Sequence, residues 1–461
     1  MDDVQLTERH RPAATGGSAE PVAGHEILLD DTGSQIEQPQ LAPVDGGVAA
    51  WRVLLAAFMF EGCLWGFPMS YGVFQQYYST IPEFAGNRYI GVVGTIASGV
   101  GYLGAPLMML LVQRYQRWLR PMIWIGWPVC ILSLVAGSFA TTLEGLILTQ
   151  GVAYGLGFLV FYYPILHMVS EYWVARRGMA FGILCGASGI SGAAMPFAVQ
   201  SLLSRYGYAV TLRAVAVALV VLTGPLLPFL RGRLPPSASS AAASAPIDWR
   251  FLRSGLFWTY SLSNLLQGFG YFFPALYLPS YAAALGIGER AGALLLAVMS
   301  VAQVCGQFAF GCLSDRRRVS TSALASTAVA VAAVACLAMW QPARSLAPLV
   351  CFAVAYGFFA AGYTAMWARM STSVCQGPDG SASSSSSAAP MVYGLLNFGK
   401  GLGNVFAGPI GGNLVARAGG QFGGDALAYR WVVVFTGICM LASAGAIGAK
   451  YLKSVRVLFS V

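Results

Sequence analysis

Residues 171–192 read EYWVARRGMAFGILCGASGISG. Two adjacent arginines, Arg176 and Arg177, are followed by an apolar segment with five glycines between residues 178 and 192. Glycine costs about 1 kcal/mol per residue in a water-exposed helix, so this density would be unfavourable in a soluble protein. In lipid, small residues let neighbouring helices approach closely and gain van der Waals contact. The stretch therefore predicts a membrane helix whose glycine face packs against another helix.

The composition extends this prediction to the whole chain. Of 461 residues, 57% are hydrophobic and 10% are charged, and nine of the 18 acidic residues lie within the first 45. From Val48 onward, apolar runs of about 20 residues recur, which is the length at which a helix crosses ~30 Å of hydrocarbon. The sequence predicts an all-α polytopic membrane protein with twelve transmembrane helices near residues 51–78, 89–113, 120–139, 143–167, 178–204, 208–231, 254–284, 289–312, 319–341, 346–371, 389–416 and 429–453.

Two low-complexity stretches interrupt these helices. RGRLPPSASSAAASAPIDWR (231–250) separates the sixth helix from the seventh, and GPDGSASSSSSAAP (377–390) precedes the eleventh. Such compositions are typical of flexible linkers. We expect a disordered cytoplasmic tail, a six-helix bundle, a cytoplasmic linker, a second six-helix bundle and a cytoplasmic tail, at residues 1–47, 48–231, 232–253, 254–453 and 454–461.

The loop arginines predict the orientation. Thirteen lie in one set of loops and six in the other, and the more basic side is cytoplasmic under the positive-inside rule. Arg176 and Arg177 then anchor the cytoplasmic start of the fifth helix. The arginines stand singly or in twos and threes at helix ends, which indicates interfacial anchoring and not nucleic-acid binding. We expect both termini in the cytoplasm and a location in the plasma membrane, with the vacuolar membrane as the alternative.

The glycine-rich segment has a second copy in the chain. MAFGILCGASGISG (179–192) aligns without a gap with MVYGLLNFGKGLGN (391–404), and AYG at 153–155 returns at 355–357. The sequence therefore predicts that the two halves are parallel six-helix repeats. Internal repeats of this kind mark secondary transporters, in which the solute site lies between the repeats near the bilayer midplane.

Several motifs together resemble a known family. They are GCLSDRRR (311–318), EYWVARRGMAFG (171–182), FPMSYGVFQQYY (67–78), GLGFLVFYYP (155–164) and PALYLPSYA (274–282). The chain resembles the major facilitator superfamily and, within it, the fungal monocarboxylate-transporter-like branch, over roughly residues 50–455. The resemblance implies two six-helix bundles that move a solute by alternating access. Asp315 and Arg316 belong to the segment that resembles the family's loop motif, whereas the corresponding first-half loop has Gln113 in place of the acid.

The chain departs from the proton-coupled lactate carriers of that branch. Those carriers have a lysine in the first helix, where this chain has Met69, and an Asp and an Arg in the eighth, where it has Gln303 and Gln307. The resemblance therefore does not transfer their proton-coupled mechanism, and it weakens lactate or pyruvate as the solute.

Three ionisable residues stand out within the predicted helices, where such groups are costly and indicate function. Lys400 lies about 14 Å into the eleventh helix at 1.5 Å per residue, and Asn397 and Asn404 share its face. Lys400 either binds a solute carboxylate or pairs with Glu61 or backbone carbonyls. Glu61, in the first helix, is expected to act in structure or gating. His167 closes the fourth helix and is interpreted as an interfacial histidine.

The candidate site is a set of polar and aromatic side chains within the predicted helices. For solute binding we select Tyr154, Asn264, Tyr271, Gln303, Gln307, Asn397, Lys400 and Asn404. Further neutral candidates are Gln75, Tyr162, Gln267, Tyr356, Tyr363 and Trp367. The gating or structural charges are Glu61, Arg176, Arg177, Asp315 and Arg316.

These observations favour a secondary transporter for a small organic solute, carboxylate-bearing or amphipathic, that exports a fungal metabolite. Uptake of a monocarboxylate or vitamin-like nutrient and a non-transporting membrane sensor are the alternatives. An enzyme is not expected, because the chain has no phosphate-binding glycine loop, metal-ligand spacing or nucleophile elbow, and His167 stands alone in the membrane part. No cofactor or metal is expected. The expected partners are the solute and the lipid bilayer, and the chain is expected to act as a monomer.

Overall fold

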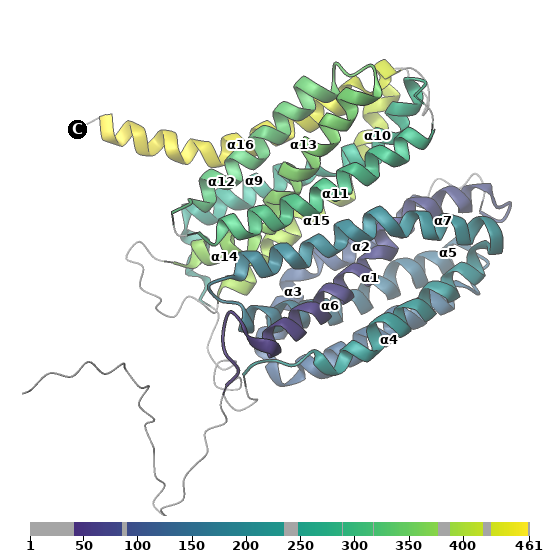
Figure 1. The fold of residues 1–461 in the computed structure, drawn as a ribbon, viewed down its shortest axis with the longest axis horizontal. Coiled ribbons are helices and arrows are strands. Elements are labelled where there is room, and N and C mark those ends of the chain that lie inside the picture. The colour runs from purple at the N-terminus through teal and green to yellow at the C-terminus, as the bar shows by residue number, and fades with distance from the viewer. Residues whose placement is uncertain are drawn as a thin grey trace, which may run out of the picture. The chain divides into compact units, whose positions relative to one another are not determined.

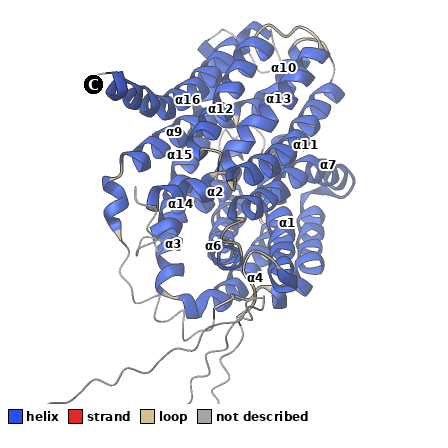
Figure 2. Ribbon diagram, turned by 60° about the vertical axis from the view of Figure 1, so that its left-hand side comes forward, coloured by secondary structure: helices blue, strands red, loops and turns tan. Residues whose placement is uncertain are grey.

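The computed structural model describes residues 41–84, 90–234, 248–287, 289–316, 318–376, 388–417 and 426–459, and the regular structure in these ranges is helical throughout (Figure 2). The predicted tail lies outside the described residues up to residue 40. Residues 235–247 of the predicted linker and the terminal residues 460–461 lie outside them as well.

The first half of the chain forms one group of helices, coloured purple to teal in Figure 1. Its helices are α1 (Gly47–Thr80), α2 (Ile90–Leu103), α3 (Ala105–Arg114), α4 (Leu119–Gly137), α5 (Leu143–Leu146), α6 (Tyr154–Tyr172) and α7 (Arg177–Thr223). Shorter 3-10 and π-helical pieces extend them at η1 (Gln116–Trp118), η2 (Ile147–Ala153) and η3 (Gly224–Phe229).

The second half forms the green-to-yellow group in Figure 1. Its helices are α9 (Gly255–Tyr271), α10 (Phe273–Ala284), α11 (Glu289–Ser314), α12 (Thr321–Val334), α13 (Leu346–Ala365), α14 (Trp367–Cys375), α15 (Ala389–Arg417) and α16 (Arg430–Phe459). Its shorter pieces are η4 (Trp249–Arg253), η5 (Ala335–Trp340) and η7 (Ala426–Tyr429).

Several predicted helices are broken into pieces. The second predicted helix consists of α2 and α3, which are bent by 42°, and the seventh consists of α9 and α10. In both cases a proline, Pro106 or Pro274, stands in the first turn of the second piece. Proline lacks the N–H that would continue the preceding helix, so it is the physical cause of such breaks. The fifth and sixth predicted helices are joined in α7, where the chain turns at Gly207 with a φ of +74°.

Eight helices in the described part of the chain are long and apolar enough to cross a bilayer, or nine if α2 and α3 form one bent span. α7 is counted once in this number, although its turn at Gly207 makes it two of the predicted helices. The segments α9–α10 and α15 are not among the eight. The pieces α9 and α10 are too short to be counted singly, with 17 and 12 residues, and α9 and α15 contain the predicted polar residues Asn264, Gln267, Asn397 and Lys400.

Two predicted boundaries differ from the structure. The predicted tail was placed up to residue 47, but Asp45 is part of the helical body, because its backbone N–H donates to the Tyr172 carbonyl at 2.8 Å. The predicted tail at 454–461 is helical as far as Phe459. The sequence YLKSVRVLF (451–459) contains no glycine or proline that would end α16 earlier.

The glycine face of α7 packs against α11. A methyl group added at Gly182 would lie 2.6 Å from the Gln307 carbonyl oxygen, and one at Gly189 would lie 2.8 Å from a Val304 methyl group. At Gly192 the nearest α11 atom, the Ser300 hydroxyl oxygen, would be 3.9 Å away. The predicted packing role of this face is therefore confirmed. We call this contact the α7–α11 seam, and it is closest at the arginine-bearing end of α7.

The second copy of the motif makes the corresponding contact. A methyl group at Gly394 of α15 would lie 3.1 Å from Cγ of Met109 in α3, and one at Gly401 would lie 2.7 Å from Cβ of Tyr102 in α2. We call this contact the α15–α2/α3 seam. Each copy of the repeat thus joins one helix group to the other, which is the packing that the sequence repeat predicts.

Candidate solute-binding site

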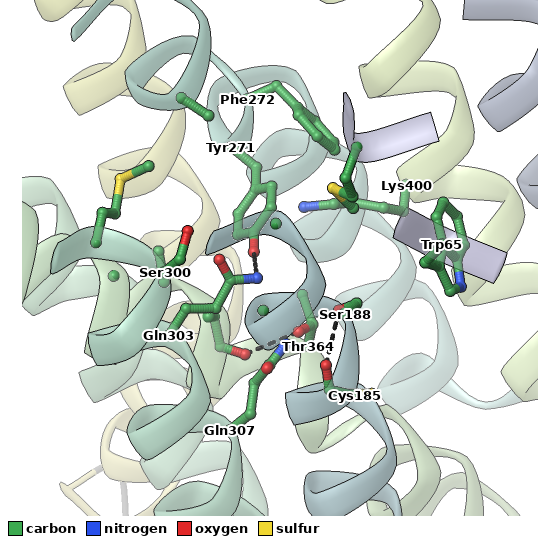
Figure 3. Close-up of a pocket in the computed structure, with 18 of the residues that line it drawn as sticks. Trp65, Cys185, Ser188, Tyr271, Phe272, Ser300, Gln303, Gln307, Thr364 and Lys400 are labelled. Carbon is green, nitrogen blue, oxygen red and sulfur yellow. Dashed lines mark hydrogen bonds between the residues drawn. The ribbon is translucent and has the colours of Figure 1, made fainter. Parts of the chain in front are cut away.

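A cavity of about 220 Å³ lies where side chains from both helix groups meet (Figure 3). One water molecule needs only about 10–15 Å³ of such space, so the cavity has room for an organic solute. Apolar and aromatic side chains form much of its wall, including Trp65, Met69, Tyr102, Phe272, Met299, Trp367 and Tyr393. Its polar lining residues are Glu61, Tyr162, Ser188, Tyr271, Ser300, Gln303, Gln307, Tyr356, Thr364, Asn397 and Lys400.

Lys400 is the cation of this cavity. It lies on α15 with 1% of its surface exposed, and its Nζ donates to Oε1 of Gln267 at 2.8 Å. The same nitrogen lies 3.2 Å from the ring centroid of Tyr271 and 5.7 Å from that of Phe272. In Figure 3 the Lys400 side chain points towards Tyr271. These contacts are a neutral amide oxygen and two ring faces, which attract a cation through their quadrupoles. The ammonium is therefore partly solvated by the protein but not neutralised by these contacts.

Glu61 supplies a carboxyl group to the same cavity. It lies on α1 with 5% of its surface exposed, and its Oε1 accepts a hydrogen bond from the Tyr162 hydroxyl at 3.2 Å. Its Oε2 is buried without a hydrogen-bond partner among the described residues. Within the same part of the chain, Glu61 forms no ion pair with Lys400. The pairing that the sequence left open is thus not formed in this structure.

Two glutamines of α11 extend the polar wall. Nε2 of Gln303 donates to the Tyr271 hydroxyl at 3.1 Å, as the dashed line in Figure 3 shows. Gln307 is 3% exposed, and its Oε1 is buried without a partner among the described residues. Asn397 also lines the cavity, and its amide donates to the Tyr393 carbonyl at 2.9 Å. Five of the eight residues selected for solute binding therefore line this cavity, namely Tyr271, Gln303, Gln307, Asn397 and Lys400.

The other three selected residues lie elsewhere. The Tyr154 hydroxyl donates to the Leu64 carbonyl at 2.5 Å, and the Asn264 amide donates to the Leu396 carbonyl at 2.5 Å. Each of these hydrogen bonds joins two helices, and neither residue is among those that line the cavity. Asn404 does not line the cavity either, and both of its amide atoms are buried without a partner in the described part of the chain.

Several lining residues were not singled out from the sequence. Trp65, Tyr102, Cys185, Ser188, Thr364 and Tyr393 all line the cavity. Each is a small or aromatic residue in an apolar helix, where the same residue types also fill ordinary helix contacts. Only Tyr393 had a usable signal, because it belongs to the repeated segment MVYG (391–394) beside Lys400.

Two carboxylates bind the backbone at the start of α7. Oδ1 and Oδ2 of Asp315 accept from the N–H groups of Gly178 and Met179 at 2.8 and 2.7 Å, and Nε of Arg369 lies 3.2 Å from Oδ1. A carboxylate at a helix N-terminus is stabilised by the free N–H groups and the helix dipole. Burial raises the pKa of Asp315, while the two N–H donors and Arg369 act in the opposite direction. We call this contact the Asp315 clamp. It joins the loop after α11 to α7.

The second carboxylate belongs to Asp45, which the sequence analysis assigned to the tail. It accepts from the N–H groups of Val174, Ala175 and Arg176 at 2.9, 3.0 and 2.8 Å. Arg176 is thus positioned through its backbone, and its side chain is exposed. We call this contact the Asp45 cap. Unlike the Asp315 clamp, it joins segments of the same helix group.

The remaining predicted charges lie near the same end. Nη2 of Arg177 donates to the Ser170 carbonyl at 3.2 Å, and Arg316 is exposed. Nδ1 of His167 lies 3.7 Å from Oε1 of Glu171, which is too long for a hydrogen bond. His167 and Arg177 both line a separate, small cavity of about 30 Å³, apart from the main one. Within the described residues, no group of three or more His, Cys, Asp or Glu side chains could hold a metal ion.

The fold and the cavity define a membrane transporter. A family model described as Major Facilitator Superfamily matches residues 53–389. The chain therefore belongs to the major facilitator superfamily, and the fold and transporter class predicted from the sequence are confirmed.

Proteins of similar sequence support the predicted branch of the superfamily. The chain is 25% identical to the MFS transporter asaE of Aspergillus flavus, with 98% of this chain and 97% of that one covered. It is 25% identical to the Fujikurins efflux protein of Gibberella fujikuroi, with 99% and 92% covered. It is 29% identical to monocarboxylate transporter 13 of Rattus norvegicus, with 70% and 74% covered. The resemblance to fungal transporters of the monocarboxylate-transporter-like branch is thus confirmed.

A solved structure supports the fold alone. The nucleoside transporter NupG superposes with a TM-score of 0.60 at 15% identity, and the match covers 87% of this chain and 99% of that one.

Proposed function

We propose that this transporter exports a small carboxylate-bearing organic metabolite by alternating access, and that Lys400 binds the carboxylate. The observation that carries the proposal is the buried ammonium of Lys400 in the solute-sized cavity, where its contacts are neutral. Burying a charge within the membrane costs at least about 2.5–3.5 kcal/mol. A solute carboxylate would offset that cost each time it binds.

The two seams support alternating access. α7 approaches α11 closely at Gly182, whereas Gly192 is separated from the same helix. Glycine faces allow two helix groups to change their angle without large side chains colliding. The Asp315 clamp, at the closely packed end, would form when that side is shut and break when it opens. The predicted cytoplasmic location of this end and of both termini rests on the arginine distribution.

Export is favoured over uptake by the names of the relatives. A relative aligned over nearly the full length of both chains is described as an efflux protein for fujikurins. Uptake of a monocarboxylate is the second candidate, because monocarboxylate transporter 13 aligns over 70% of this chain. The proposal includes a plasma-membrane location and a monomeric state. A non-transporting sensor has no supporting observation of comparable weight.

The test begins by finding the solute. The culture medium of a strain that lacks the gene is compared by metabolomics with that of the complemented strain. A carboxylate-bearing compound that is depleted from the medium and accumulates in the cells of the deletion strain supports export. Depletion of an added nutrient from the medium by the complemented strain alone would instead support uptake.

Variants then test the role of Lys400. We expect Lys400→Gln to lower export roughly 10- to 100-fold, because a hydrogen bond to a charged group contributes about 1.5–3 kcal/mol. Lys400→Arg should retain part of the activity. Lys453→Gln, which removes the same charge near the C-terminal end of the sequence, is the control. Since Lys400 and Glu61 are not paired here, the double variant with Glu61→Gln should not restore export. Wild-type export by Lys400→Gln, or rescue by the double variant, would contradict the proposal.

A further inference from the structure

The cavity is lined by an amine and a carboxyl group that form no ion pair with each other in the described part of the chain. Lys400 lies on α15 of the second helix group and Glu61 on α1 of the first, and both line the same cavity. They are 1% and 5% exposed, and they form no ion pair within the described residues. A buried pair of charges is usually in direct contact, because only contact offsets the cost of removing both from water. Separated charges in a solute-sized cavity leave that compensation to a ligand.

The Glu61 carboxyl group has one oxygen atom that is available as a hydrogen-bond acceptor. Tyr162 donates to Oε1, whereas Oε2 is buried without a partner in the described part of the chain. The other titratable groups that surround it are neutral phenols and a thiol, from α2, α6, α7 and α15: Tyr102, Tyr163, Cys185 and Tyr393. An ionised carboxylate in this place therefore favours a ligand group that is positively charged and donates hydrogen bonds.

The Lys400 ammonium has more N–H donors than its hydrogen bond to Gln267 uses. An ammonium group carries three N–H donors, and one of them goes to Oε1 of Gln267. The Tyr271 ring covers one side of the nitrogen at 3.2 Å. The remaining donors suit a carboxylate oxygen. The two residues are thus complementary to a carboxylate and to an ammonium.

Gln307 adds a third point of recognition. Its Oε1 is buried and unpartnered among the described residues, and it lines the same cavity. A neutral acceptor of this kind suits an N–H or O–H of the ligand and is costly when left unpaired. Other parts of the cavity wall are aromatic, with Trp65, Phe272 and Trp367 among their residues.

We infer that the solute is a zwitterion, an amino-carboxylate with an apolar or aromatic body. Its carboxylate binds Lys400, its ammonium binds Oε2 of Glu61, and a further donor reaches Oε1 of Gln307. This inference rests on the proposed function and narrows its substrate class from carboxylates in general to those that also carry an ammonium group. A plain monocarboxylate would leave Glu61 uncompensated beside its own negative charge.

Three probes that share a phenyl ring test this inference. Phenylalanine carries both charges, 3-phenylpropionate carries the carboxylate alone and 2-phenylethylamine carries the ammonium alone. Binding to the purified full-length protein is measured as the ligand-dependent rise in melting temperature, which yields a Kd. We expect phenylalanine to bind at least about tenfold more tightly than either single-charge probe, because each charge-assisted hydrogen bond is worth about 1.5–3 kcal/mol.

Charge-removing variants identify which end binds which group. Glu61→Gln should reduce the affinity for phenylalanine to that for 3-phenylpropionate, and Lys400→Gln should reduce it to that for 2-phenylethylamine. Glu61→Asp keeps the negative charge and should keep the preference for phenylalanine. This conservative variant separates the loss of charge from a general defect in folding, which the melting temperature without ligand also reports.

The outcomes separate the inference from the proposed function. If 3-phenylpropionate binds as tightly as phenylalanine, and Lys400→Gln abolishes both, the solute is a carboxylate without an ammonium. The zwitterion inference is then overturned, and the proposed function stands. If no probe binds, or Lys400→Gln leaves the binding of every probe unchanged, the inference and the role of Lys400 in the proposed function both fall.

Discussion

The α7–α11 seam and the α15–α2/α3 seam are built in the same register. Gly182 faces residues 307 and 311 of α11, and Gly394 faces residues 105 and 109 of α3. Four residues further along, Asp315 in one seam corresponds to Gln113 in the other. Because these correspondences follow from contacts as well as from the sequence repeat, the two seams can be compared position by position.

The seams differ in what holds them together at that end. In the α7–α11 seam, Asp315 accepts from the N–H groups of Gly178 and Met179 and pairs with Arg369. In the α15–α2/α3 seam, Gln113 cannot supply a negative charge, and Pro390 stands where α7 has Gly178. Proline has no N–H to donate. Both halves of the carboxylate-to-backbone contact are therefore changed together, which indicates that the second seam lacks the ionic clamp of the first.

The largest expected difference concerns packing at the two glycines. In Gly182→Ala the new methyl group meets a backbone oxygen, that of Gln307, at 2.6 Å, whereas in Gly394→Ala it first meets the flexible Met109 side chain at 3.1 Å. Overpacking costs about 1–3 kcal/mol, and we expect most of that cost in Gly182→Ala and less than half of it in Gly394→Ala. Melting temperature and export, measured together, check this order.

A third alanine variant on α7 is the matched control. A methyl group at Gly186 would lie 3.5 Å from a Val304 methyl group, which is ordinary van der Waals contact. Gly186→Ala should therefore behave as the wild type. If Gly182→Ala and Gly186→Ala were equally active and stable, the α7–α11 seam would not be a close-packed contact.

The sequence predicted the features of this comparison that depend on periodicity. Glycines four residues apart indicate a packing face, and their repetition in 391–404 indicates a second one. Apolar run length predicted the helices, and the breaks at Pro106 and Pro274 fall within them. These signals come from neighbouring positions of one helix, so they can be read without knowing which helix lies opposite.

The sequence could not separate residues that face the cavity from polar residues that join helices. Tyr154 and Asn264 have the same chemistry as Tyr271 and Asn397, but they donate to carbonyl groups of neighbouring helices. Any polar group within the membrane needs a partner, and only the fold decides whether that partner is protein or solute. Asp45 was missed for a related reason. Its stretch has the composition of a tail, although its carboxylate caps the loop before α7.

A smaller effect is expected from the Asp315 clamp. Asp315→Asn keeps one oxygen acceptor but loses the charge that strengthens its bonds to Gly178, Met179 and Arg369. We expect the clamped conformation to lose about 1 kcal/mol, the difference between a charged and a neutral hydrogen bond, which is a shift of roughly fivefold in its equilibrium with the open one. The rate at which a thiol reagent labels a cysteine introduced at Ser314 should rise accordingly in an otherwise cysteine-free protein. Unchanged labelling would show that the clamp does not bias the two conformations.

The smallest effect is expected where the second seam is given the missing acid. Gln113→Asp supplies a carboxylate at the position that corresponds to Asp315, but Pro390 provides no N–H at the position of Gly178. We therefore expect Gln113→Asp alone not to stabilise the seam, because the new carboxylate has no backbone donor at position 390. The double variant Gln113→Asp with Pro390→Gly supplies donor and acceptor together, and a new charge-assisted contact should then stabilise this seam by about 1 kcal/mol and slow export.

Pro390→Gly alone is the control, and it should lower the melting temperature because glycine makes the unfolded chain more flexible. A double-mutant cycle of melting temperatures measures the coupling between the two positions. Stabilisation by Gln113→Asp alone, or no coupling in the cycle, would mean that the two seams differ for a reason other than the paired loss of the acid and the backbone donor.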